Sequence, residues 1–427
     1  MIYPQRNLKR KYIIFFTSIF VLTLANIVAS TVILSMLVTK KMFSPKTPIV
    51  YLDPVQNVQL LNDPTLPPTV TPTTSSSQTP TLSLTPTPVV KKSMKGFGIS
   101  GGGVDHFDQK DLDQYFESLK SLGVHWVRYD IDWSVVQKDS PTSYNWAGID
   151  RVTATAKRYG LSSLGVITYT PRWASAESCG AKLKCPPVDP AAFGRFAGQV
   201  VSRYKNSIKY WQVWNEPNLA GFLGSSSDIK KYADILREAS TEIKKIDPQA
   251  VVLTGGIAAS DDGQDGSLSP PTFIQTLYKL NAKPYFDAVA LHPYSYPAAP
   301  SYPEKWNSWQ QISSVRQAMV ANGDSAKKIW ITEYGAPTGG PGNMYVINQF
   351  SFNDGSDYMS EAAQEEMARQ AATLYKNQLG DWMGPFFWYS LTDEGTSKDT
   401  PENFFGLLRF DGSKKPAYET FKSIINQ

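Results

Sequence analysis

Histidine, cysteine and net charge are scarce in this chain. Of its 427 residues, three are His and two are Cys, and the formal net charge is only +4. A metal site rich in His or Cys therefore has few ligands to draw on. No stretch of Lys and Arg interleaved with aromatic residues provides the positive footprint of a nucleic-acid-binding protein. We expect no metal, no organic cofactor and no nucleic-acid partner, so the chemistry must come from other side chains.

Aromatic residues, by contrast, are abundant: 11 Trp, 22 Tyr and 20 Phe. Buried aromatic rings dominate most protein cores, so core packing is the first expectation for any one of them. An aromatic face also fits the apolar C–H face of a pyranose ring. The composition is therefore compatible with a large core and with a surface that binds sugars.

The N-terminal segment predicts the compartment. Four basic residues crowd residues 1–11, an uncharged run spans 12–38, and Lys40 and Lys41 follow it. The run matches the roughly 20 residues of a transmembrane helix and exceeds the ~7–15 apolar residues of a cleaved signal peptide. Basic residues favour the cytoplasmic side. We predict a cytoplasmic tail (1–11), a signal anchor (12–38) and an extracellular remainder. The alternative is secretion after cleavage near Ala29–Ser30.

Residues 44–95 predict a linker. Pro, Thr and Ser dominate residues 62–90, with repeated Thr-Pro steps. Such a segment has little apolar surface to bury and should form a disordered, semi-stiff spacer.

Residues 96–427 predict one domain of repeated β–α units, because short apolar runs alternate with longer amphipathic stretches. The expected strands are 96–100, 126–131, 163–168, 210–214, 251–254, 288–292, 329–332 and 386–390. The expected helices are 111–121, 146–159, 190–204, 227–246, 271–280, 308–322 and 361–379.

Eight units over this length favour an α/β fold of the (β/α)8 (TIM) barrel type. A doubly wound open sheet is the alternative, but it normally carries a Gly-rich phosphate loop after the first strand. Residues 101–103, three glycines, lack the spacing of that loop.

Two of the expected strands end in a glutamate. The fourth runs into Trp-Asn-Glu-Pro with Glu216, and the seventh into Thr-Glu-Tyr-Gly with Glu333. Parallel barrel strands end at the same mouth, so both carboxylates should face it. Each follows apolar residues, where an unpaired charge is costly without a function. Two facing carboxylic acids are what glycosidic cleavage requires, although a pair of salt-bridged scaffold residues is the alternative.

These two motifs resemble the hallmark of the clan A glycoside hydrolases, retaining (β/α)8 enzymes. The resemblance covers nearly all of residues 96–427. The motifs at 292–294, 387–389 and 405–418 are similar to those of families 5 and 39, and family 39, with β-xylosidases and exopolysaccharide-cleaving endoglycosidases, is the closer. Family 5 members usually carry a His at the end of strand three, and residues 168–173 have none.

The resemblance implies roles for individual residues. Glu216 would be the acid/base and Glu333 the nucleophile, and Asn215 would bond the sugar 2-hydroxyl. Arg128, in the second strand, would lie near Glu333 and hold it ionised. The other implied site residues are His292 and Tyr294, which would orient the carboxylates, and Trp388, which would form the floor under the sugar.

Other interpretations of these residues stay open. Arg128 could pair with Asp130 or Asp132 instead. His292 could be a rim residue without catalytic effect, and Trp388 could belong to the barrel core. Two further tryptophans, Trp133 and Trp173, follow strands two and three and could line outer subsites or pack on the surface.

Cys179 and Cys185 lie six positions apart after the third strand. Outside the cell they should form a disulfide that stiffens a loop at the barrel mouth. Two free thiols are the alternative.

The sequence thus predicts a monomeric, cell-surface glycosidase that cleaves β-linked glycans. A transglycosylase would use the same residues, and a glycan-binding protein would ordinarily have lost one glutamate. Exo and endo action both remain open, with a slight preference for endo action because a long tether suits a polymer.

Overall fold

The computed structural model describes most of the chain beyond the N-terminal segment. The described residues are 95–179, 184–223, 228–263, 265–345 and 357–427. The predicted anchor at 12–38 and almost all of the predicted linker lie outside them. Among the helices of the described ranges, none combines the length and the apolar character needed to cross a bilayer.

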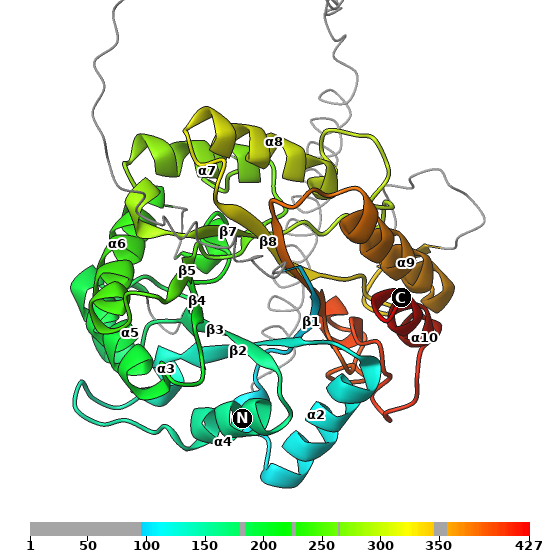
Figure 1. The fold of residues 1–427 in the computed structure, drawn as a ribbon, viewed down its shortest axis with the longest axis horizontal. Helices are drawn as coiled ribbons and strands as arrows, with labels where there is room; N and C mark the ends of the chain where they lie inside the picture. Colours follow the sequence, from blue (N-terminus) through cyan, green and yellow to red (C-terminus); the bar gives the residue numbers. More distant parts are fainter. Residues whose placement is uncertain (1–94, 180–183, 224–227, 264, 346–356) are drawn as a thin grey trace, which may run out of the picture. The chain divides into compact units, whose positions relative to one another are not determined.

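The described residues form a closed parallel barrel (Figure 1). Its strands are β1 (Phe97–Ser100), β2 (Trp126–Asp132), β3 (Ser162–Thr168), β4 (Tyr210–Val213), β5 (Val251–Leu253), β7 (Ala288–His292), β8 (Lys328–Tyr334) and β11 (Met383–Tyr389). Pairing of β1 with β11 and of β5 with β7 closes the circle. The short strand β6 (Ile257–Ala258) also pairs with β7 and extends β5 toward the mouth. The predicted (β/α)8 barrel is confirmed.

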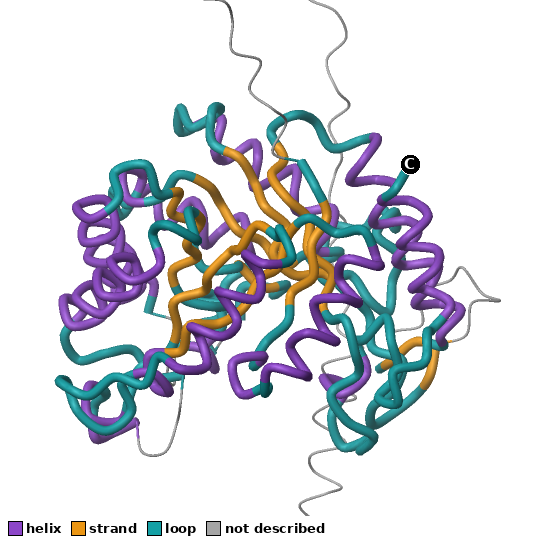
Figure 2. Tube along the Cα trace, turned by 60° about the horizontal axis from the view of Figure 1, so that its bottom comes forward, coloured by secondary structure: helices purple, strands orange, loops and turns teal. Residues whose placement is uncertain are grey.

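Helices surround the strands as an outer layer (Figures 1 and 2). They are α2 (Gln109–Leu122), α3 (Trp133–Val136), α4 (Ala147–Arg158), α5 (Pro190–Tyr204), α6 (Ile229–Ile246), α7 (Pro270–Lys279), α8 (Ser308–Ala321), α9 (Glu361–Asn377) and α10 (Pro416–Ile425). The short α3 and the C-terminal α10 were not predicted. The strands β9 (Met344–Tyr345) and β10 (Tyr358–Met359) form a separate pair.

Local chemistry explains where several helices begin. The side chain of Asp108 accepts a hydrogen bond from the backbone N–H of Asp111 and so caps α2. Ser360 caps α9 in the same way. At α5, Asp189 is the cap and Pro190, whose missing N–H costs nothing there, is the first helical residue. Short polar caps and an N-terminal proline are the expected starts of helices.

A small apolar cluster fills the lower interior of the barrel. It combines large and small side chains from several strands, among them Trp126, Leu164, Leu253, Trp330 and Phe387. The interior is therefore a packed core and not a pore, and a functional site must lie above it, at the C-terminal ends of the strands.

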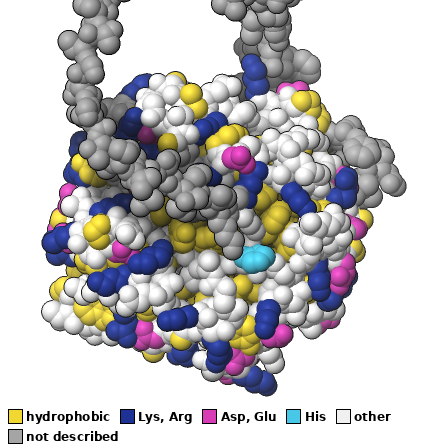
Figure 3. All heavy atoms as spheres, in the orientation of Figure 1, with side chains coloured by type: hydrophobic (Ala, Val, Ile, Leu, Met, Phe, Trp, Pro, Cys, Tyr) yellow, Lys and Arg dark blue, Asp and Glu magenta, His cyan; other side chains and the backbone are white. Residues whose placement is uncertain are grey.

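On the face drawn in Figure 3, Lys and Arg side chains are interspersed with Asp and Glu.

Candidate active site

Strand β2 sends a series of side chains up the interior of the barrel. Successive residues of a strand point to opposite faces, so Trp126, Arg128 and Asp130 share one face. Trp126 belongs to the packed floor, and Arg128 and Asp130 line the cavity above it. Arg128 and Asp130 therefore both lie in the mouth of the barrel, above the buried Trp126.

Arg128 connects three strands through its guanidinium group, which is almost fully buried. Its Nη1 donates to Glu333 Oε1 at 2.6 Å and to Ser100 Oγ at 2.8 Å. Its Nη2 donates to Asn215 Oδ1 at 2.8 Å, and its Nε donates to Gln212 Oε1 at 3.3 Å. The guanidinium therefore fixes Glu333 and Asn215 relative to each other and brings the ends of β4 and β8 together.

The pairing of β8 with β11 explains why Glu333 faces the interior. Trp330 belongs to the barrel floor, so strict alternation would turn Glu333 outward and Tyr334 inward. A shift in the β8–β11 register interrupts this alternation. As a result, the Tyr334 ring packs against Trp309 and Trp388, and the Glu333 carboxylate meets Arg128.

Glu333 sits among positive and hydrogen-bonding partners. Tyr294 donates its hydroxyl to Glu333 Oε2 at 2.9 Å, and His292 Nδ1 lies 3.5 Å from the same oxygen. Burial raises the pKa of Glu333, but the charges of His292 and Arg128 and the hydrogen bonds from Tyr294 and Arg128 outweigh it, so its pKa is lowered. Glu333 is therefore the carboxylate that the site holds ionised.

Glu216 stands on a strained turn. After β4 ends, Trp214 and Glu216 adopt φ angles of 72° and 49°, in the left-handed region that bulky L-residues rarely occupy. The backbone N–H of Glu216 donates to Gly256 O at 3.0 Å, which ties the turn to the neighbouring segment. The side chain meets His292 Nδ1 at 3.1 Å. Strain of this kind concentrates at functional sites, where the surrounding structure holds it.

A glycine makes room for the histidine between the carboxylates. A Cβ at Gly256 would lie 2.0 Å from His292 Nε2. The imidazole is fully buried against this backbone. Any side chain at position 256 would therefore displace His292 from its contacts with Glu216 and Glu333.

The two carboxylates are close together. One oxygen of Glu216, one of Glu333 and one nitrogen of His292 all lie within 4.8 Å of one another, and within the described ranges this is the one His/carboxylate group with metal-ligand spacing. A cation there would have to compete with Arg128 for Glu333. The arrangement instead suits two carboxyl groups that act on opposite sides of one bond.

A cavity of about 550 Å3 opens above these groups. Its wall includes Arg128, Asn215, Glu216, Tyr294 and Glu333 from the predicted set. His292 lies behind the two carboxylates, fully buried. Six of the predicted residues are thus brought together at one mouth.

Trp388 is not brought to the cavity. Phe387 belongs to the interior floor, so alternation along β11 turns Trp388 outward and Tyr389 inward. Trp388 is fully buried, and its ring contacts Tyr334 and Phe421. Tyr389 lines the cavity instead.

Trp133 and Trp173 also lie away from the cavity. They contact each other edge to face, with ring centroids 5.5 Å apart, and Trp133 stacks on Phe196 of α5. Trp133 is 1% exposed, and Trp173 is 36% exposed. They belong to a packed aromatic cluster at the outer side of the barrel.

Several cavity residues were not predicted: Asp130, Tyr169, Lys184, Tyr389 and Glu402. Burial raises the pKa of Asp130 to about 6 although Arg128 opposes the shift. Burial lowers the pKa of Lys184, whose ammonium lies 3.3 Å from the centroid of the Phe222 ring. The spacing of Asp130 from Arg128 and the alternation along β11 could have identified Asp130 and Tyr389. Tyr169, Lys184 and Glu402 lie outside the strands and carry no such pattern.

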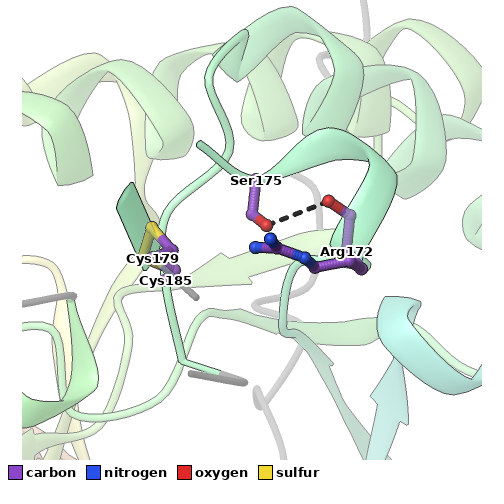
Figure 4. The surroundings of a disulfide bond; sticks show 4 residues. All are labelled: Arg172, Ser175, Cys179 and Cys185. Atoms are coloured by element: carbon purple, nitrogen blue, oxygen red, sulfur yellow. Dashed lines mark hydrogen bonds between the residues drawn. A yellow bond between two sulfur atoms is a disulfide. The ribbon is translucent and has the colours of Figure 1, made fainter. Parts of the chain in front are cut away.

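The two cysteines form a disulfide, as predicted (Figure 4). Nearby, Ser175 Oγ donates to the backbone oxygen of Arg172 at 3.1 Å. Cys185 is adjacent to Lys184, so the bridge restrains the segment that delivers this ammonium to the cavity wall.

Fold and site together define a class: a (β/α)8 barrel with paired carboxylates from β4 and β8, the arrangement of clan A glycoside hydrolases. Residues 186–417, more than half of the chain, match the family described as "Glycosyl hydrolase catalytic core". The chain belongs to this family.

Individual relatives agree with this assignment. A β-xylosidase from Caldicellulosiruptor saccharolyticus is 23% identical over 328 residues, which cover 72% of this chain and 61% of the relative. A family 39 glycoside hydrolase from Bacteroides cellulosilyticus WH2 shares the fold with a TM-score of 0.59 and 21% identity, over 77% of this chain and 63% of that chain. The chain thus spans less than two thirds of either relative.

A family 5 structure is similar as well. A GH5_18 protein from Streptomyces cattleya, solved with GlcNAc, gives a TM-score of 0.57 at 15% identity, over 77% of this chain and 79% of that chain. The fold is therefore shared with both families that the sequence motifs resemble, and the resemblance to family 39 stands.

Proposed function

We propose that the chain is a retaining glycosidase that cleaves β-glycosidic bonds with Glu333 as nucleophile and Glu216 as acid/base. The observation that carries the proposal is the pair of carboxylate oxygens within 4.8 Å, one of them on the arginine-paired Glu333. Retaining enzymes hold their carboxyl groups about 5–5.5 Å apart, whereas inverting enzymes need about 6.5–9.5 Å to admit a water molecule. The short separation supports retention.

The proposed reaction has two steps. The Glu333 carboxylate attacks the anomeric carbon while Glu216 gives its proton to the leaving glycosidic oxygen, which forms a glycosyl ester on Glu333. Glu216, now ionised, then takes a proton from a water molecule, whose oxygen attacks the same carbon and releases Glu333. Asn215 accepts from Arg128 through its Oδ1 at 2.8 Å, so its amide NH2 is the group that would donate to the sugar 2-hydroxyl. Two inversions give net retention.

The test uses the full-length chain and 4-nitrophenyl β-xyloside, β-glucoside and β-mannoside. Similar proteins include the β-xylosidase above, a glucosidase from Croceicoccus marinus and an exo-β-1,4-mannosidase from Opitutaceae bacterium strain TAV5. We expect Glu216→Gln and Glu333→Gln each to lower kcat about 100- to 10,000-fold on the cleaved substrate, the range for removal of an acid–base group, because each residue takes part in a step of the reaction. Glu117→Gln, a matched change of an exposed glutamate in α2, should leave it unchanged. Full activity in both site variants would reject the proposal.

Azide distinguishes the two roles. In Glu216→Ala, azide should attack the glycosyl ester and yield a β-glycosyl azide. In Glu333→Ala, azide should attack the substrate directly and yield the α-anomer. The opposite pair of anomers would exchange the roles of the two residues. Products that carry an added sugar in place of water would identify a transglycosylase, and binding without turnover a glycan-binding protein.

We propose in addition that residues 12–38 anchor the chain in the cell membrane, with residues 44–95 as a spacer and residues 96–427 as the extracellular catalytic domain. The support is the length of the uncharged run and the basic residues before it. An extracellular location also agrees with the disulfide.

A further inference from the structure

A second cavity, of about 580 Å3, lies beside the catalytic cavity. Its wall is formed by the segment after β1, the segment after β11 and one side of α2. Both strand ends belong to the mouth of the barrel. The volume lies within the range of small-molecule binding sites, and no step of the proposed reaction uses it.

The two cavities adjoin. Gly102 belongs to the wall of both, and the consecutive residues Tyr389 and Ser390 line the catalytic and the second cavity respectively. A Cβ at Gly102 would meet no atom within 4 Å, so the boundary is open at this point. Burial raises the pKa of Glu394 in the second cavity, and the negative charge of Glu402 in the catalytic cavity adds to the shift.

The second cavity offers the contacts that a sugar ring needs. Phe410 at its wall is 59% exposed and presents an apolar ring. His106 and Glu394 provide polar groups beside it. The hydroxyl of Tyr115 is buried without a hydrogen-bond partner in the described part of the chain. A buried polar atom without a partner calls for an explanation, and a ligand hydroxyl would supply the missing bond.

The charge of this wall favours an uncharged ligand. Its described lining contains Asp111, Asp393 and Glu394 but neither Lys nor Arg. The charge of Asp393 is balanced by Lys415, whose Nζ lies 2.7 Å from Asp393 Oδ1. The carboxylate of a uronic acid would meet Glu394 without a permanent positive charge to offset the repulsion.

We infer that the second cavity is a subsite for a neutral sugar ring of the same β-linked glycan, so that the substrate occupies two adjoining cavities. Phe410 would stack on the apolar face of the ring, and Tyr115 and Glu394 would bond its hydroxyls. The inference rests on the proposed function and deepens it, because a site of two cavities favours an oligomeric or polymeric substrate over a single terminal sugar.

The test is calorimetric titration of the full-length Glu333→Gln variant. The probes are β-1,4-linked xylo-, cello- and manno-oligosaccharides of one to six units. We expect the affinity in at least one series to rise about tenfold or more as added units reach the second cavity. Phe410→Ala, Glu394→Gln, or Gly102→Leu, which narrows the open boundary, should each remove about tenfold of that gain, equivalent to one good contact.

Val320→Ala is the matched control, because Val320 is 49% exposed near the end of α8, a helix that lies across the barrel from α2 (Figure 1). It should retain the gain with length. An affinity that does not rise with length in any series, or a gain that survives all three cavity variants, would overturn the inference. Since the titrated variant needs no catalysis, length-dependent binding that Phe410→Ala abolishes would support the second subsite even if the wild type proved inactive.

Discussion

At the scale of single residues, the cavity combines a carboxylate held ionised with one whose charge is opposed. Glu333 and Asp130 both face Arg128 on the interior of the barrel, but the guanidinium bonds Glu333 directly. At Asp130 burial outweighs the charge of Arg128, and the pKa rises to about 6. The charges of His292 and Arg128 overcome the burial of Glu333, whereas burial dominates at Asp130, so the two carboxyl groups titrate apart.

The raised pKa of Asp130 should make the free energy of unfolding depend on pH. A carboxyl whose folded pKa is raised from 3.8 to about 6 stabilises the fold fully below pH ~4, and this contribution is lost as the pH rises through 6. Asp130→Asn should therefore raise the unfolding free energy at pH 7 by about 1–2 kcal/mol, after allowance for solvent in the cavity. At pH 4 the variant and the wild type should be equally stable.

Denaturant unfolding at both pH values measures this effect. Asp261→Asn, a change at an exposed carboxyl, is the control and should leave the pH profile as in the wild type. A difference between Asp130→Asn and the wild type that is the same at pH 4 and pH 7 would contradict the linkage.

Single residues also show what the sequence could and could not predict. The strand-end positions of Glu216 and Glu333 follow from the apolar runs before them, because parallel strands deliver their last residues to one mouth. Trp388 was predicted to form the floor of the sugar site, and this prediction was wrong. The side-chain alternation of β11 turns its ring outward, where it packs against Phe421. Lys184 lies in a turn and Glu402 in a single 3-10 turn, Pro401–Phe404, and no periodic pattern encodes either.

At the scale of elements, a buried ion pair joins two of the connections that complete the barrel. Lys415, just before α10, donates Nζ to Asp393 Oδ1 at 2.7 Å and to Thr338 Oγ1 at 2.8 Å, and its side chain is 1% exposed. Asp393 also accepts from the backbone N–H of Gly406. The segments after β8 and β11 and the start of α10 thus meet at one ammonium.

Lys415→Met should destabilise the fold by about 3–5 kcal/mol, because it leaves the Asp393 carboxylate buried without its partner. The double variant Lys415→Met/Asp393→Asn removes both charges and should recover much of the loss. Denaturant unfolding of the four proteins of this cycle gives the coupling energy. Equal destabilisation in the single and double variants would show that packing, not charge, accounts for the effect.

Element boundaries were more predictable than their irregularities. All eight barrel strands and seven helices overlap the predicted ranges because each carries a periodic apolar pattern. The register shift between β8 and β11, which turns Glu333 inward, depends on the packing of both strands against their neighbours. The interruption between β5 and β6 places Gly256 beside His292 for a similar tertiary reason. Such irregularities position the site, and a pattern of hydrophobic residues does not contain them.

At the scale of the whole molecule, the described barrel and the N-terminal segment predict separable properties. The barrel, residues 95–427, contains the carboxylate pair and its own apolar core. The uncharged run of residues 12–38 lies outside the described residues. If it is a signal anchor, its removal should change the location of the enzyme without changing its chemistry.

We therefore expect the full-length chain, expressed in a bacterial host, to sediment with membranes and to resist alkaline carbonate extraction. A fragment of residues 95–427, exported with a cleavable signal peptide, should stay in the supernatant with the same kcat within about twofold. Leu24→Arg in the full-length chain is the control, because an arginine at the centre of the run costs about 2.5–3.5 kcal/mol of insertion free energy. It should shift protein to the soluble fraction. A full-length chain that is trimmed near Ala29 and released would instead support secretion, and the spacer would then connect the barrel to no membrane.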